Sequence, residues 1–151
     1  MQEIGLRVSA LRSKYRRCSR RRGRDAQFPY LLGVFKLYRR LRRRSDKISA
    51  ARRTLLQLQT VRSRRRQHIM RLIIDATAHG APAKAKSRWT RALRFIWRER
   101  RRWRRFKVFV KEQGGIAGCA DQWAALNPRY PKDHIVYRDP AGRVYLVVQR
   151  P

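Results

Sequence analysis

Apolar residues recur through most of the first 113 residues at alternating steps of three and four, the spacing of one face of an α-helix. In the first segment this heptad-like stripe consists of Ile4, Val8, Leu11, Tyr15 and Cys18. Arg, Lys and Ser occupy most of the positions between them. We therefore predict an amphipathic helix that frays at Arg21–Arg24, where like charges accumulate and Gly23 interrupts the pattern.

A second helical stretch begins near Pro29, which suits a first helical turn because that turn leaves its backbone N–H groups unpaired. The apolar stripe that follows is interrupted twice, at Arg42–Asp46 and at Arg62–Gln67. We predict a break near Ser45, where Ser or Asp can cap a new helix, and an unbroken helix through the second interruption. The alternative is one long helix without the break.

The segment His79-Gly80-Ala81-Pro82 predicts the end of that helix, with glycine in the left-handed cap position and proline behind it. A third amphipathic helix is predicted over Lys84–Gln113. Two long helices joined by a short turn are expected to fold back as an antiparallel hairpin, with the first helix as the third side of a bundle. The stripe of the third helix consists of Trp89, Leu93, Ile96, Trp103, Phe106 and Val110.

The chain changes character after Gly114-Gly115. Residues 116–126 predict a short, almost uncharged helix, and His134–Arg138 and Arg143–Gln149 predict two strands. Between the strands, Asp139-Pro140-Ala141-Gly142 places proline and glycine where a turn favours them. Because a lone hairpin is marginal in water, one of its faces is expected to pack on the helices.

The predicted fold class is therefore mainly α: an antiparallel bundle or hairpin of long Arg-rich amphipathic helices with a small C-terminal helix plus β-hairpin. We divide the chain into a basic N-terminal helix or arm (1–28), a basic helical hairpin or bundle (29–113) and a near-neutral helix plus β-hairpin module (114–151).

Charge adds a second feature, since 41 Lys and Arg residues face nine Asp and Glu residues, a net charge of +32. Residues 1–112 hold 36 of the basic residues and six of the acidic ones. Such a density of like charge repels itself, so we expect this part to lie against a polyanion, with nucleic acid ahead of an anionic membrane. The excess of Arg over Lys suits phosphate recognition, and Arg-rich codon usage in a GC-rich genome explains it equally well.

The basic residues form clusters that recur along the predicted helices beside aromatic rings. Solvated helix faces normally mix charges of both signs, and these faces do not, so we predict phosphate contacts from the clusters and base stacking on Trp97. Charge on several sides of a bundle suits wrapping or bridging better than a single recognition helix. The predicted nucleic-acid-binding residues are Arg16, Arg17, Arg20, Arg21, Arg22, Arg39, Arg40, Arg42, Arg43, Arg44, Arg62, Arg64, Arg65, Arg66, Trp97, Arg98, Arg101, Arg102 and Arg105.

His68, Asp75 and His79 share one predicted helical face, which raises the hypotheses of a metal site and of an Asp75–His79 acid–base pair. Two helical turns, roughly 10 Å, separate His68 from Asp75. We therefore predict no metal, no cofactor and no enzyme, because paired acids and a phosphate-binding glycine loop are also missing from the sequence. A weaker hypothesis is a nuclease site built from Asp121, Asp133, His134 and Asp139.

These patterns predict a nucleic-acid-binding accessory or architectural protein, with DNA favoured over RNA and a protein partner expected at residues 114–151. The first alternative is an RNA-bound structural protein of ribosomal type. A membrane-active cationic protein and a small nuclease are weaker alternatives. A winged-helix interpretation of the tail is disfavoured, because Pro128 and Pro131 occupy the place of its recognition helix.

The sequence also bears on location. No apolar run approaches the roughly 18 residues of a membrane span. Cys18 and Cys119 lack metal-ligand spacing, which favours a reducing compartment. We expect a cytoplasmic protein associated with the nucleoid or with a ribonucleoprotein, although the Arg- and Ser-rich start of the chain also fits a mitochondrial presequence.

Overall fold

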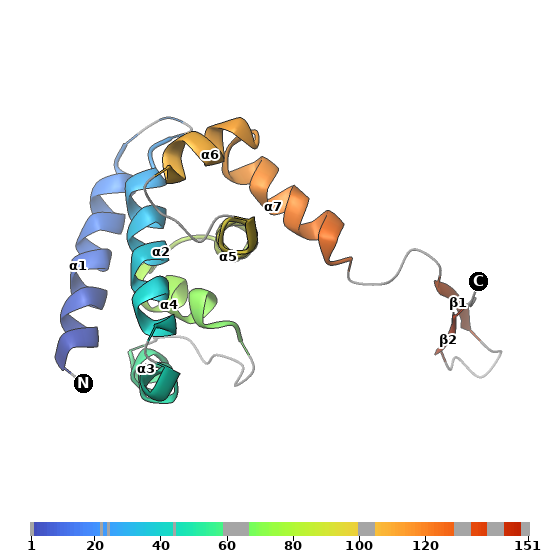
Figure 1. The fold of residues 1–151 in the computed structure, drawn as a ribbon, viewed down its shortest axis with the longest axis horizontal. Coiled ribbons are helices and arrows are strands. Elements are labelled where there is room, and N and C mark those ends of the chain that lie inside the picture. Colours follow the sequence, from blue (N-terminus) through green and yellow to red (C-terminus); the bar gives the residue numbers. More distant parts are fainter. Residues whose placement is uncertain are drawn as a thin grey trace.

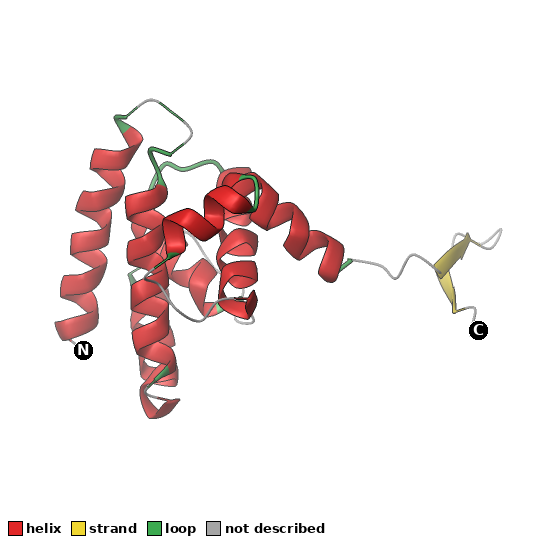
Figure 2. Cartoon of the chain, turned by 45° about the horizontal axis from the view of Figure 1, so that its top comes forward, coloured by secondary structure: helices red, strands yellow, loops and turns green. Residues whose placement is uncertain are grey.

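The computed structural model describes residues 2–21, 23, 25–43, 45–58, 67–99, 105–128, 134–138 and 144–148. Within these ranges the chain forms seven helices and two strands, shown in Figures 1 and 2. They are α1 (Gln2–Ser19), α2 (Phe28–Arg42), α3 (Ser45–Gln57), α4 (Ile69–Thr77), α5 (Ala83–Glu99), α6 (Phe106–Glu112), α7 (Gly115–Leu126), β1 (His134–Arg138) and β2 (Val144–Val148).

The core is organised around α4, which is apolar on nearly every side. A helix that is hydrophobic all round has to be buried, and the side chains of Leu72, Ile73 and Ile74 have no exposed surface. Four helices, α1, α2, α3 and α5, contact α4, and Figure 1 shows it between α2 and α5. The basic helices therefore cover a common apolar centre.

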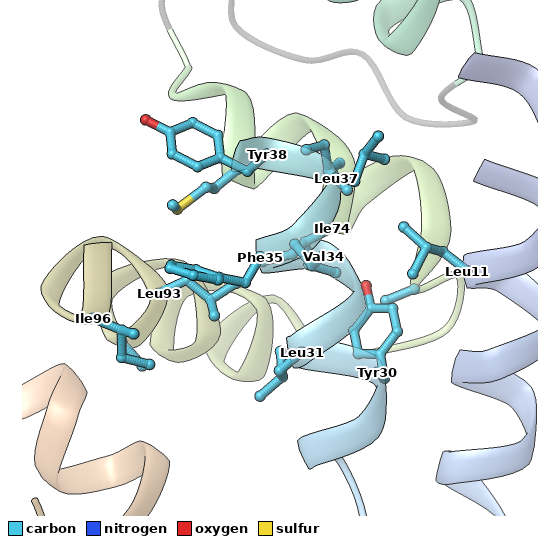
Figure 3. Close-up of a cluster of buried hydrophobic side chains, with 14 of the residues drawn as sticks. Leu11, Tyr30, Leu31, Val34, Phe35, Leu37, Tyr38, Ile74, Leu93 and Ile96 are labelled. Atoms are coloured by element: carbon cyan, nitrogen blue, oxygen red, sulfur yellow. The ribbon is translucent and has the colours of Figure 1, made fainter. Parts of the chain in front are cut away.

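The second large contribution to the core comes from α2 (Figure 3). Leu31, Val34 and Phe35 are completely buried, and side chains of α1, α4 and α5 surround them, including Ile74 and Leu93. Figure 3 also shows that Leu11 approaches this cluster from α1. The apolar stripes predicted from the sequence thus meet in one core.

A buried hydrogen-bonded pair connects α2 to α4. Thr77 Oγ1 donates to the Ile73 carbonyl oxygen at 2.6 Å, so the Tyr30 hydroxyl is the donor of its 2.7 Å hydrogen bond to Thr77 Oγ1. Burial raises the pKa of Tyr30, which keeps the phenol protonated. Both buried hydroxyl groups are therefore satisfied without water.

Arg12 joins α1 to the C-terminal ends of two other helices. Its Nε donates to the Ala76 carbonyl oxygen at 2.9 Å, and its Nη2 donates to the Leu58 carbonyl oxygen at 2.9 Å. Carbonyl groups at these ends lack intrahelical partners, and a cation is favoured there by the helix dipole. Arg12 therefore has a structural role that its place in the sequence did not reveal.

The prediction of mainly helical structure is correct, but the predicted long helices are wrong. The helix expected to continue through Arg62–Gln67 ends at Gln57 in α3, and α4 starts at Ile69. Most helical stability in proteins comes from packing an apolar face, and residues 62–67 provide none. The expected helix Lys84–Gln113 is likewise divided into α5 and α6. The described helices are therefore separate elements, four of which contact α4, and they do not form a hairpin of two long helices.

The prediction that a β-hairpin forms part of the helical fold is also wrong. No strand occurs among the described residues of 2–128. β1 and β2 pair with each other in antiparallel register, with His134 opposite Val148, but Figure 1 shows them away from the helices. α7 packs on α5, with Trp123 against the core cluster, and Figure 1 shows β1 and β2 beyond its C-terminal end. The fold class is corrected to mainly α.

We expect Ile73→Ala to lower the free energy of unfolding by about 2–4 kcal/mol, because it leaves a cavity where several helices meet. The matched control is Leu6→Ala, since Leu6 is 72% exposed, and its effect should stay within about 0.5 kcal/mol. Urea unfolding followed by circular dichroism measures both. Equal losses in the two variants would contradict a core centred on α4.

Candidate functional site

A groove of about 440 Å³ lies between α1 and α2, which run side by side in Figure 1. Among the described residues its lining contains five basic side chains and no acidic one. We call it the α1–α2 groove. It is lined by Arg7, Ala10 and Leu11 from α1 and by Gly33, Lys36, Leu37, Arg39, Arg40 and Arg43 from α2 and its C-terminal cap.

Gly33 brings the two helices close together at the groove. A Cβ atom at this position would lie 2.6 Å from Leu11 Cδ2 and 3.7 Å from Lys14 Cδ. Leu11 and Leu37 are buried, whereas Lys36, Arg40 and Arg43 are exposed. The groove therefore combines an apolar contact between the helices with cations that reach solvent.

Helical periodicity explains why the cations of α2 gather on this side. Lys36, Arg40 and Arg43 follow at steps of four and three, which places them on one face. The opposite positions are used by buried residues such as Phe35 and Tyr38. Basic residues in the last turn of α2 suit its dipole, but like charges at such spacings repel one another. A bound polyanion would relieve this repulsion.

The carboxylate of Glu3 contacts two of the groove cations. Arg7 Nη2 and Nε donate to Glu3 Oε1 at 2.9 and 3.2 Å, and Arg40 Nη1 lies 4.0 Å from the same oxygen. All three side chains are substantially exposed. The ion pairs therefore remain open to exchange with ions from solution.

The structure brings together only part of the predicted basic set. Arg39, Arg40 and Arg43 line the groove with Arg7 and Lys36, which the sequence prediction missed. Gly33, a residue without a side chain inside the otherwise large-residue helix α2, was the available signal for a close contact there.

Other predicted cations lie elsewhere or outside the described residues. Exposed positions outside the groove are Arg16, Arg17, Arg20, Arg21, Arg42, Arg98 and Arg105. The residues outside the described part of the chain are Arg22, Arg44, Arg62, Arg64, Arg65, Arg66, Arg101 and Arg102.

Trp97, the predicted base-stacking residue, is packed against other rings. Its ring centroid lies 5.0 Å from that of Tyr38, edge to face, and 6.0 Å from that of Phe35. The side chain is only partly exposed. These contacts give Trp97 a place beside the core, and its role in stacking stays a prediction.

His68 serves as the N-cap of α4. Its Nδ1 accepts a hydrogen bond from the Met70 backbone N–H at 3.2 Å, so the neutral ring has its proton on Nε2. Burial, together with the neighbouring cations Arg94, Arg42 and Arg52, lowers the pKa of His68 to about 4. His68 is therefore a neutral capping residue at physiological pH.

Asp75 and His79 do not join His68 in one site. Asp75 pairs with Arg71 at 2.8 Å and with Lys86 at 3.5 Å. Burial lowers the pKa of His79, and Arg12 is the first of the nearby cations that add to this effect. Among the residues that the structure describes, no group of three His, Cys, Asp or Glu side chains could hold a metal ion.

In the described part of the chain, no helix combines the length and apolar character needed to cross a membrane. No protein family, curated protein or solved structure matches this chain. Its function has to be inferred from its own residues.

We expect stability to fall as the pH drops from 6.5 towards 4, because the folded pKa of His68 lies below its ordinary value of 6.5. The unfolded chain then binds the proton first, so stability is complete above pH 6.5 and declines below it. The variant His68→Asn keeps a capping acceptor. Between pH 6.5 and 4.5, its free energy of unfolding should fall by roughly 1–2 kcal/mol less than that of the wild type. Urea unfolding across this range measures the difference, and parallel pH profiles would rule out His68 as the cause.

Proposed function

We propose that this protein binds nucleic acid mainly through phosphate groups, with the α1–α2 groove as one principal contact surface. The observation that supports this most directly is the convergence of five basic side chains from two helices on one groove. Arg and Lys neutralise phosphates and release their counterions, which supplies a large part of the affinity of such complexes.

Phosphate contact is favoured over the stacking of unpaired bases. Stacking requires an accessible aromatic face, but Tyr15, Tyr30 and Trp89 contact one another edge to face. Arg94 covers the ring of Trp123, with its guanidinium carbon 4.3 Å from the ring centroid. These rings are committed to contacts within the protein, which supports a duplex as the ligand. We propose DNA ahead of structured RNA.

The distribution of charge supports an accessory or architectural role. Exposed arginines occur at the C-terminal end of α1, including Arg16 and Arg20, and also on α5, at Arg88, Arg91 and Arg98. Cations on several helices suit contact with more than one segment of a polyanion. The near-neutral residues 114–151 are proposed as a protein contact, and the cytoplasmic nucleoid as the location.

We expect the Arg40→Gln/Arg43→Gln variant to bind duplex DNA about tenfold more weakly at 0.15 M salt, with the slope of log affinity against log salt reduced by about 1–2. The matched control, Arg88→Gln/Arg91→Gln, removes two exposed charges of α5 and should change both quantities less. Fluorescence anisotropy with a labelled duplex of 20 base pairs measures them.

Three results would contradict this proposal or part of it. If the wild type binds neither duplex DNA nor structured RNA, the proposed function is wrong. If the two double variants lose equal affinity for duplex DNA, the groove is not a principal contact surface. If the protein binds structured RNA more strongly than duplex DNA at the same salt concentration, RNA and not DNA is the ligand.

A further inference from the structure

Glu3 connects the two walls of the α1–α2 groove. Its Oε1 accepts hydrogen bonds from Arg7 of α1 at 2.9 and 3.2 Å and lies 4.0 Å from Arg40 Nη1 of α2. Arg7 and Arg40 both line the groove. A single carboxylate thus engages one cation from each helix.

A carboxylate uses the same donors that a phosphate would use. Guanidinium groups bind both anions through charge-assisted N–H donors, so the contacts that Arg7 makes with Glu3 cannot at the same time be made with a phosphate oxygen. Other acids are held elsewhere: Asp25 pairs with Lys111, and Glu99 pairs with Arg98.

The Glu3 contacts are also weak enough to be replaced. The side chain of Glu3 is 62% exposed, and those of Arg7 and Arg40 are 41% and 52% exposed. Exposed ion pairs are screened by water and salt, whereas a polyanion offers many phosphates in series and releases counterions when it binds. The contacts of Glu3 are therefore ones that a phosphate can replace.

We infer that Glu3 is an internal competitor for phosphate, which holds Arg7 and Arg40 in the free protein and weakens the binding of nucleic acid to the α1–α2 groove. This inference rests on the proposed function of the groove. It assigns Glu3 a regulatory role: the carboxylate disfavours weak or isolated anions more than a long polyanion, which contacts the remaining cations as well.

Glu3 also has a structural effect, because an acid in the first turn of α1 is favoured by the helix dipole. Loss of that effect would loosen α1 and lower the affinity, which is the opposite of the change expected from loss of a competitor. The direction of the change in affinity therefore separates the two roles. Glu3→Asp keeps the charge in the first turn but shortens its reach towards Arg40.

The test compares Glu3→Gln with Glu99→Gln in duplex DNA binding measured by fluorescence anisotropy, with circular dichroism as the check on folding. Glu99→Gln removes an equal charge and frees Arg98, which lies outside the groove. We expect Glu3→Gln to raise the affinity about two- to fivefold, Glu99→Gln to raise it less, and Glu3→Asp to give an intermediate gain.

A second comparison locates the effect. In the Arg40→Gln/Arg43→Gln background, the gain in affinity from Glu3→Gln should be smaller, because the Arg40 guanidinium that Glu3 contacts is absent. A gain of the same size in both backgrounds, a gain equal to that of Glu99→Gln, or a loss of affinity in Glu3→Gln would each overturn the inference. Failure of the wild type to bind any nucleic acid would instead overturn the proposed function itself.

Discussion

Burial of α4 sets the arrangement of the helices that surround it. A short helix with apolar side chains on nearly every side cannot remain in water, so it has to be covered from several directions. Helices α1, α2, α3 and α5 provide that cover. Each of them presents its own apolar stripe to the centre and leaves its charged side chains outside, since burying an unpaired charge is costly. The positive charge of these helices thus lies on the surface that surrounds a packed core.

The same constraint places several charged groups in structural roles. Arg12 reaches carbonyl groups at the ends of α3 and α4, and Asp75 holds Arg71 and Lys86. His68, which caps α4, stays neutral because burial lowers its pKa. These interactions use a small part of the charge. Many of the other cations that the structure describes are exposed, and this supports the proposed contact with a polyanion.

The α1–α2 groove follows from how closely two helices pack. Gly33 allows Leu11 to approach the backbone of α2. This close packing brings the cations of the two helices near one another, although their charges repel. Glu3 offsets part of that repulsion through Arg7 and Arg40. The proposed phosphate contacts and the proposed competition by Glu3 therefore arise from one piece of geometry.

Sequence alone determined which residues are apolar, and hence the helical character and the stripes that contain Leu11, Leu31 and Leu93. It also located the helix ends at Gly80 and Gly114, because a left-handed backbone favours glycine. The lengths of α3 and α5 were mispredicted, since periodicity does not show whether a stripe finds a surface to pack against. The predicted packing of the strands failed for the same reason.

Part of the candidate site followed from the sequence, because Arg39, Arg40 and Arg43 form an obvious cluster. Arg7, Lys36 and Glu3 did not, because each is an ordinary polar position on a helix that contains many. Helix packing brings α1 against α2 at Gly33 and places these side chains in one groove. Charge is a property of composition, but a binding surface depends on which helices are neighbours, and burial of α4 decides that.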